Sequence, residues 1–315
     1  VYHVSPEDGR RLGCQALLGA AGFTGSRPAG LALKEAADRA GKPIYLEMSS
    51  VNPVFILPGA LRERGPDIAA ELFASCTAGN GQFCTKPGLI VLIAGPESEG
   101  FLAALRAAFD AAPAGVLLGR GVLKGLEAGA ARLARLGARL AAGQARPEGP
   151  GFRWRPALFE VGGARFLEEA AGFQIESFGA LTLAVAVRNL GEAAAVAASL
   201  EGQLTAGVYS ARDDSDEEAY AALEPVLRLK AGRLLNDKAP TGVAVSPAMV
   251  HGGPYPASGH PGFTSVGLPA AMTRFAALLC YDNVRPDRLP PELRDANPTG
   301  TMWRLVDGAW TRRSL

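Results

Sequence analysis

The stretch LLGAAGFTGSRPAGLALKEAADRAGKPIYLEM (residues 17–48) decides the fold class. It opens with an apolar run that ends at Gly25-Ser26, and a helix is predicted next, from about Pro28 to Ala40. Proline suits the first helical turn, and Gly41 suits the position after the last turn. The apolar run Pro43–Met48 predicts a buried strand. A strand, a glycine turn, a helix and a strand make a βαβ unit, so the sequence predicts an α/β fold with a parallel sheet.

The same alternation continues along the chain. Apolar runs predict further strands at Val54–Leu57, Leu89–Ile93, Leu181–Val187 and 203–209. Helical spacing of apolar residues predicts helices at Pro66–Cys76, Phe101–Ala111, 120–144 and 191–201. Residues 1–15 show neither a strong strand nor a complete capped helix, and the Pro-rich stretch Arg285–Pro298 is predicted to be an arm or loop.

Composition excludes several classes of protein. The net charge of +1 gives no bulk electrostatic case for binding nucleic acid or a membrane surface. No apolar run approaches the ~18 residues that span a bilayer, and the opening VYHVSPEDGRR carries charges where a signal peptide would be apolar. The four cysteines show no regular spacing, so they do not make a disulfide framework. We therefore expect a reducing compartment, the cytoplasm.

One cysteine sits in an unusual setting. Cys84 lies in CTAGNGQFCTKPG (residues 76–88), where neighbouring glycines allow unusual backbone angles and the close approach of a ligand. Such a loop suits an activated thiolate nucleophile, and it also suits a buried or incidental thiol. Cys76, on the preceding helix, is predicted to be core, and Cys14 and Cys280 are predicted to be structural.

Other candidate groups are weaker by themselves. Glu47 ends a predicted strand, where it is either a general base or the first solvated residue. Gly25-Ser26 could bind a phosphate through backbone amides or could be an ordinary turn, since no GxGxxG or GxxxxGK[ST] motif occurs. We expect no metal site, because the histidines have no ligand spacing and no CxxC pair exists. The histidines are His3, His251 and His260, of which His251 lies in a Gly/Pro-rich loop typical of site-lining segments.

Taken in order, the motifs FTGSRPAG, EMSSVNP, GQFC, IESFGA and HGGPYPASGHPGFTSVG resemble those of the aldehyde dehydrogenase superfamily. Within it, the longer stretches EMSSVNPVFILPGAL, GQFCTKPGLIV, AGRLLNDKAPTGVAVSPAMVHGGPYP and LRDANP are most similar to the α-ketoglutaric semialdehyde dehydrogenase group, which is related to NADP-dependent fatty-aldehyde enzymes. The resemblance covers essentially the whole chain. It implies a partial Rossmann-like coenzyme domain followed by an α/β catalytic domain.

The resemblance implies a reaction and the residues that perform it. Cys84 would attack the aldehyde and carry it first as a thiohemiacetal and then as a thioester, and its backbone N–H would form half of an oxyanion hole. Glu47 would activate the water that hydrolyses the thioester. The reaction would be NAD- or NADP-dependent oxidation of an aldehyde to a carboxylate, 2,5-dioxopentanoate to 2-oxoglutarate. Self-association into a dimer or tetramer is also implied.

The coenzyme contacts follow from the same resemblance. The coenzyme turn would contain Gly25, Ser26 and Gly30, with Ser26 near the pyrophosphate. Glu176 would hold the nicotinamide ribose, and Phe178 would pack beside the nicotinamide. The domains would be a coenzyme-domain remnant at 1–48, a catalytic domain at 49–265, and a segment at 266–315 that returns to the coenzyme domain and the oligomer interface.

The sequence departs from the family pattern in three places. EMSSV stands where ELGGK is usual, and Ala180 stands where the family has proline. The front of the coenzyme domain, with its ribose-binding lysine and oxyanion asparagine, is not found, so we expect an N-terminally truncated chain. The chain is then either part of an active enzyme or a catalytically incompetent fragment that acts as a binding or scaffold subunit. A thiol-dependent acyltransferase or esterase is a third interpretation, against which FTGS and Glu176 argue.

Overall fold

The computed structural model describes residues 4–143, 149–244, 246, 248–249, 252–263 and 269–315. The chain divides into two compact units, Val1–Phe275 and Ala276–Leu315, each of which is considered by itself. Among the described residues, no helix is long and apolar enough to cross a membrane.

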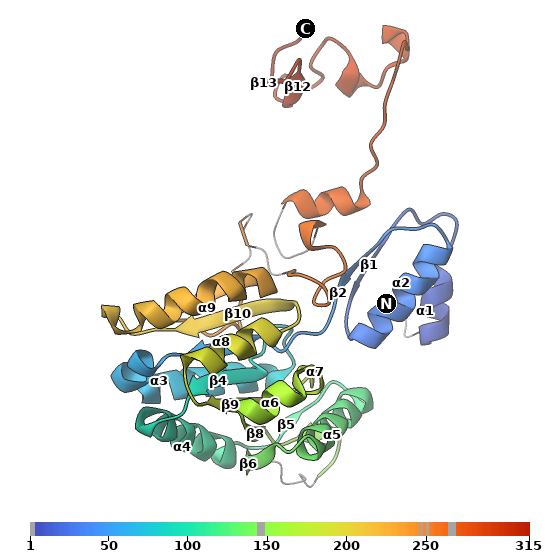
Figure 1. Ribbon diagram of the computed structural model, residues 1–315. Helices are drawn as coiled ribbons and strands as arrows, with labels where there is room; N and C mark the ends of the chain where they lie inside the picture. The colour runs from blue at the N-terminus through green and yellow to red at the C-terminus, as the bar shows by residue number, and fades with distance from the viewer. Residues whose placement is uncertain (1–3, 144–148, 245, 247, 250–251, 264–268) are drawn as a thin grey trace. The chain divides into compact units, whose positions relative to one another are not determined.

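A seven-stranded sheet forms the centre of the first unit (Figure 1). Its strands, in spatial order, are β11 (Ala231–Asn236), β10 (Gln203–Tyr209), β3 (Pro53–Ile56), β4 (Leu89–Ile93), β9 (Leu181–Val187), β8 (Ala157–Gly162) and β6 (Arg139–Gly143). Neighbouring strands run parallel, except that β6 is antiparallel to β8. The α/β class and the parallel sheet predicted from the sequence are confirmed.

Helices cover both faces of this sheet. The helices are α3 (Pro58–Thr77), α4 (Pro96–Ala111), α5 (Arg120–Arg135), α6 (Gly163–Glu168), α7 (Ala170–Phe173), α8 (Leu190–Ser199) and α9 (Glu217–Lys230). Apolar residues of α3 and α4 join one buried cluster, and those of α5, α6, α8 and α9 join the other. Strand β9 contributes Leu183 and Val185 to one cluster and Ala184 to the opposite one, as expected for a strand buried on both faces.

The opening βαβ unit forms a small sheet of its own. Strands β1 (Ala21–Thr24) and β2 (Ile44–Glu47) pair in parallel, with α2 (Arg27–Arg39) between them, close to the predicted bounds. Helix α1 (Pro6–Gly13) precedes them, so the prediction that residues 1–15 lack a capped helix is wrong. Ser5 caps this helix by accepting a hydrogen bond from the backbone N–H of Asp8 at 3.1 Å.

The predicted long helix over 120–144 is also wrong. The helix ends at Arg135, because Gly137 adopts a left-handed backbone conformation (φ 90°) that closes the last turn. Residues 139–143 then form strand β6, which pairs with β8 at the sheet edge. The helical pattern of alanine, leucine and arginine continues through this segment, but pairing with β8 overrides it.

The predicted helix Pro66–Cys76 begins earlier, at Pro58. Its first turns are separated from the rest at Arg64, whose backbone is non-helical (φ −149°, ψ 31°) two residues before Pro66. Two short strands, β5 (Gly115–Val116) and β7 (Arg153–Trp154), pair outside the main sheet.

The second unit contains a hairpin of β12 (Arg304–Val306) and β13 (Ala309–Thr311). The stretch predicted as an arm contains two short 3₁₀ turns and no strand in its described residues. Cys280 is exposed, so its assignment as a packed, structural cysteine is wrong. The local sequence around it is apolar (FAALLCY), which explains the error.

Candidate active site

The turn that carries Cys84 is held from the neighbouring strand. Cys84 lies between the end of α3 and the start of β4, at the amino-terminal edge of the main sheet. The Asn52 side-chain amide donates to the carbonyl oxygens of Cys84 (2.9 Å) and Lys86 (3.0 Å). Asn52 is itself buried and accepts a hydrogen bond from the Thr205 hydroxyl at 2.9 Å. These bonds fix the backbone of the turn while the Cys84 side chain stays partly exposed.

The cysteines of the first unit have different surroundings. Cys76 is completely buried, as predicted, and burial raises the pKa of its thiol to about 11. It therefore stays protonated at neutral pH and is a core residue. Cys14 is partly buried, and its thiol lies 3.4 Å from the carbonyl oxygen of Ala36. Of these three, only Cys84 combines a partly exposed thiol with a turn fixed by buried polar groups.

The Cys84 turn packs closely against the segment IESFGA. Gly81 has a left-handed backbone conformation (φ 72°), and a Cβ atom placed on it would lie 2.3 Å from the backbone nitrogen of Ala180. Only glycine fits this position without displacing one of the two segments. The contact brings together two motifs that lie about a hundred residues apart in the sequence.

We expect Gly81→Ala to destabilise the protein by about 2 kcal/mol or more, because it adds both a steric clash and left-handed strain. Urea unfolding of the variant measures this. Gly125→Ala in α5 is the matched control, since nothing lies within 4 Å of a Cβ at that position. The control should be neutral or more stable by up to about 1 kcal/mol. Equal stability of the two variants would contradict the close packing.

Glu47 ends β2 at the carboxyl end of that strand, as the sequence predicts. The late loop docks on the same strand: Met48 N–H donates to the Ala257 carbonyl (2.7 Å), and Gly259 N–H donates to the Leu46 carbonyl (2.9 Å). An isolated bridge pairs Glu47 with Ser258. The segment around Glu47 is therefore set by backbone bonds to a loop more than two hundred residues later in the chain. His251 and His3 lie outside the described residues.

The predicted coenzyme turn lies between β1 and α2. The Gly25 N–H donates to the Glu47 carbonyl at 3.1 Å, so the turn adjoins the proposed base. Ser26 occupies the N-cap of α2 and makes no side-chain cap bond, and Gly30 is buried against Met48. The positive end of this 13-residue helix suits a phosphate group, although the Arg27 N–H already bonds to the Ser49 hydroxyl and Pro28 has no N–H.

Glu176 lies in a polar cluster beside this turn. Burial raises the pKa of Glu176, and the neighbouring Ser49 hydroxyl and Ser50 backbone oppose that rise. The buried Lys86 Nζ donates to the Leu181 carbonyl at 2.6 Å. Burial lowers the pKa of Lys86, and the positive charge of its protonated form opposes the rise in the pKa of Glu176. A small cavity is lined by Ser50, Lys86, Glu176 and Leu181. Phe178, two residues beyond Glu176, is exposed.

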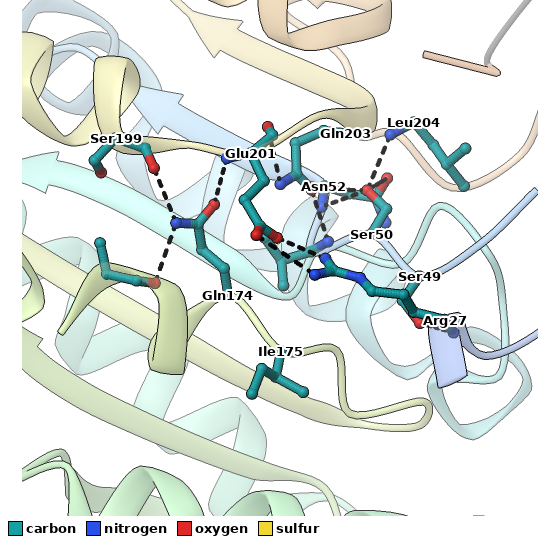
Figure 2. Close-up of polar contacts among 12 residues, drawn as sticks. Arg27, Ser49, Ser50, Asn52, Gln174, Ile175, Ser199, Glu201, Gln203 and Leu204 are labelled. Carbon is teal, nitrogen blue, oxygen red and sulfur yellow. Dashed lines mark hydrogen bonds and ion pairs between the residues drawn. The ribbon is translucent and has the colours of Figure 1, made fainter. Parts of the chain in front are cut away.

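Sequence reasoning missed the residues that join the coenzyme turn to the main sheet. Figure 2 shows Arg27, from the first turn of α2, in an ion pair with Glu201 at 2.5 Å. The Glu201 N–H donates to the Gln174 side chain at 2.8 Å, and the Arg27 N–H donates to the Ser49 hydroxyl at 3.2 Å. No local pattern indicates these residues, because Arg27 and Glu201 are 174 residues apart.

Known proteins resemble this chain in sequence and in fold. A family model described as the aldehyde dehydrogenase family matches residues 4–253. The chain belongs to this family. It is 44% identical over 291 residues to alpha-ketoglutaric semialdehyde dehydrogenase 2 of Azospirillum brasilense, covering 92% of this chain and 54% of the relative. It is 41% identical over 300 residues to the alpha-ketoglutaric semialdehyde dehydrogenase of Acinetobacter baylyi, covering 94% of this chain and 56% of the relative.

Solved aldehyde dehydrogenase structures share the fold. One titled 1-pyrroline-5-carboxylate dehydrogenase has a TM-score of 0.72 at 22% identity, over 86% of this chain and 52% of that chain. An indole-3-acetaldehyde dehydrogenase in complex with NAD+ has a TM-score of 0.69 at 20% identity, over 85% of this chain and 52% of that chain. The chain spans about half the length of the curated relatives it matches.

In this aldehyde dehydrogenase chain, the predicted site residues fall into two groups. Gly25, Ser26, Glu47 and Glu176 are linked through the β1–α2 turn and Ser49. Cys84 lies in the second group, with Asn52 and Thr205 at the amino-terminal edge of the main sheet. Within the described residues, no cluster of three or more His, Cys, Asp or Glu could hold a metal ion.

Proposed function

We propose that this chain is the part of an NAD(P)-dependent aldehyde dehydrogenase that carries the nucleophile and the general base, and that its substrate is 2,5-dioxopentanoate. The observation that carries the proposal is the Cys84 turn, whose backbone is fixed by the buried Asn52 while its thiol remains accessible. The names of the two relatives, at 44% and 41% identity, support the substrate.

In the proposed reaction, the Cys84 thiolate adds to the aldehyde carbon and forms a thiohemiacetal. Developing charge on the substrate oxygen is stabilised by the Cys84 N–H. A nicotinamide coenzyme held beside this carbon would supply the hydride acceptor for its oxidation. Cys84 then holds the acyl group as a thioester, and water must attack it to release the carboxylate and regenerate the thiol.

Glu47 is proposed to activate that water. A carboxylate can take a proton from water as the oxygen attacks the thioester carbon. The backbone bonds of β2 to the late loop position Glu47, and the Gly25 N–H bond to the Glu47 carbonyl ties it to the coenzyme turn. This link would align the Glu47 carboxylate with a coenzyme bound at the turn.

The residues that would hold the coenzyme are consistent with its chemistry. The amino-terminal end of α2, preceded by Gly25 and Ser26, would place the positive end of a helix dipole beside a pyrophosphate, whereas the N–H groups of Gly25 and Gly30 are bonded to the Glu47 and Ser26 carbonyls. The Glu176 carboxylate can accept hydrogen bonds from ribose hydroxyls, and the exposed Phe178 can pack against a ring. Either NAD or NADP fits these groups. We also propose a dimer or tetramer and, from the cysteine usage, the cytoplasm as the compartment.

The proposed role of Glu176 makes coenzyme binding pH-dependent. Burial raises the pKa of Glu176 and the Lys86 ammonium lowers it, so Lys86→Met should raise that pKa further. Coenzyme affinity should therefore weaken as the pH falls through the pKa of Glu176, and this loss should begin at higher pH in the variant. The coenzyme KM of the wild type and of Lys86→Met, measured across the acidic pH range, tests this expectation. Lys124→Met, which removes an exposed lysine of α5, is the control and should leave the profile unchanged.

A non-catalytic subunit is the second candidate. It is favoured by the small size of the sheet in the proposed coenzyme-binding part, where the described residues add no third strand to β1 and β2. A Rossmann-type site normally lies at the edge of a larger parallel sheet.

One experiment separates the two candidates. Reduced nicotinamide formation is measured with 2,5-dioxopentanoate and each of NAD and NADP, for the 315-residue chain and for a chimera. In the chimera, the amino-terminal part of the Azospirillum relative precedes the chain. We expect turnover by the chimera, and the better coenzyme then identifies the preference. A folded chimera without turnover would support the non-catalytic subunit and overturn the proposed function.

A further inference from the structure

An arginine of β11 lies in the same row of the sheet as the residues that hold the Cys84 turn. Arg233 is in register with Thr205 of β10, and register partners in parallel strands point to the same side of a sheet. The Thr205 hydroxyl donates to Asn52, and Asn52 donates to the Cys84 carbonyl. This row of side chains therefore runs from Arg233 through the buried residues Thr205 and Asn52 to the backbone of Cys84.

A second path reaches the same turn from the arginine. The Arg233 Nη2 donates to the Pro240 carbonyl at 2.7 Å. The next residue, Thr241, places its hydroxyl 3.5 Å from the Thr85 carbonyl, directly after Cys84. The loop that fixes the guanidinium is thus the loop that contacts the nucleophile turn. Burial lowers the pKa of Arg233, and the nearby Cys84 partly opposes that shift.

The guanidinium has no anionic partner within the described part of the chain. Its Nη1 meets the Met249 sulfur at 3.8 Å, which is a weak acceptor. Its Nε is buried and makes no hydrogen bond there. The side chain is half-buried, and an arginine stays charged in such a place. A half-buried cation whose Nη1 has only a thioether for a partner is poorly satisfied, and a carboxylate that pairs with the guanidinium would reduce that cost.

We propose that Arg233 binds the carboxylate of the substrate, so that the site selects an aldehyde that carries a carboxylate at the far end of a short chain. This inference rests on the proposed function, and it names the residue that determines specificity. Guanidinium and carboxylate groups form paired hydrogen bonds in a fixed plane. With its carboxylate held at Arg233, a short-chain substrate can direct its aldehyde carbon to Cys84.

The test uses the 315-residue chain and needs neither coenzyme nor turnover. Alkylation of Cys84 by iodoacetamide is followed by peptide mass spectrometry, with 2-oxoglutarate as the protecting ligand and glutaramide as its uncharged comparison. We expect 2-oxoglutarate to slow alkylation of the wild-type chain and glutaramide to have little effect. Arg233→Met should require about 10²-fold more 2-oxoglutarate for the same protection. Arg135→Met, which removes an exposed arginine of α5, should behave as the wild type.

Two further measurements keep the outcomes distinct. Arg233→Lys keeps the charge and should recover part of the protection, which also covers the case in which the methionine variant fails to fold. Equal protection in Arg233→Met, or none in the wild type, would overturn the proposal. Slower alkylation of ligand-free Arg233→Met with protection intact would also overturn it, because the arginine would then act on the thiol. Failure of turnover in the chimera with protection intact would count against the proposed oxidation and leave the carboxylate site standing.

Discussion

Cys84→Ala should abolish aldehyde oxidation by the chimera, with a fall in rate of at least about 10⁴-fold. Without the sulfur, neither the thiohemiacetal nor the thioester can form, and removal of a covalent nucleophile costs factors of this order or more. The turn itself should survive, since Asn52 bonds to the Cys84 carbonyl and not to its side chain. Reduced nicotinamide formation measures the loss, and thermal unfolding should show a stability close to that of the wild type.

Cys280→Ala is the matched control for this experiment. Cys280 is exposed and lies in the other compact unit, so its replacement should leave the rate within about two-fold of the wild type, as for most surface changes. Full activity in Cys84→Ala would show that the nucleophile is another group. Loss of activity in both variants would point to a general effect of cysteine replacement.

Glu47→Gln should slow turnover by about 10³-fold and change which step limits the rate. The amide keeps the size and hydrogen-bonding reach of the carboxylate but cannot take a proton from water. Acylation of Cys84 should still occur, so each site should release one equivalent of reduced nicotinamide quickly and then stop. Rapid mixing detects this burst, and mass spectrometry of the quenched protein should find the acyl group on Cys84.

Glu127→Gln is the matched control, since Glu127 is an exposed glutamate of α5. It should show steady turnover at the wild-type rate without accumulation of the thioester. A Glu47→Gln variant with no burst would mean that Glu47 acts before or during acylation, for example on the thiol. A variant with unchanged turnover would remove Glu47 from the mechanism.

Where the predictions from the sequence were wrong, contacts with other segments or details of the backbone explain the error. Residues 139–143 continue a helical pattern, yet they form a strand because β8 supplies a partner and Gly137 ends the helix. Helix α1 was missed because it is short, buries no residue and contains few apolar side chains. Cys280 was misassigned because an apolar neighbourhood in sequence does not guarantee burial in space.

The sequence by itself determined the alternation of strands and helices, the opening βαβ unit and the ordered motifs that contain Cys84, Glu47 and Glu176. These are local properties, because periodicity and turn residues report the backbone of about ten neighbouring residues at a time. Only the tertiary structure showed that Asn52 holds the Cys84 turn and that Arg27 pairs with Glu201. It also showed that Arg233 lies beside Thr205 in the main sheet. Such contacts depend on strand order and register, and these are set by packing between segments far apart in the chain.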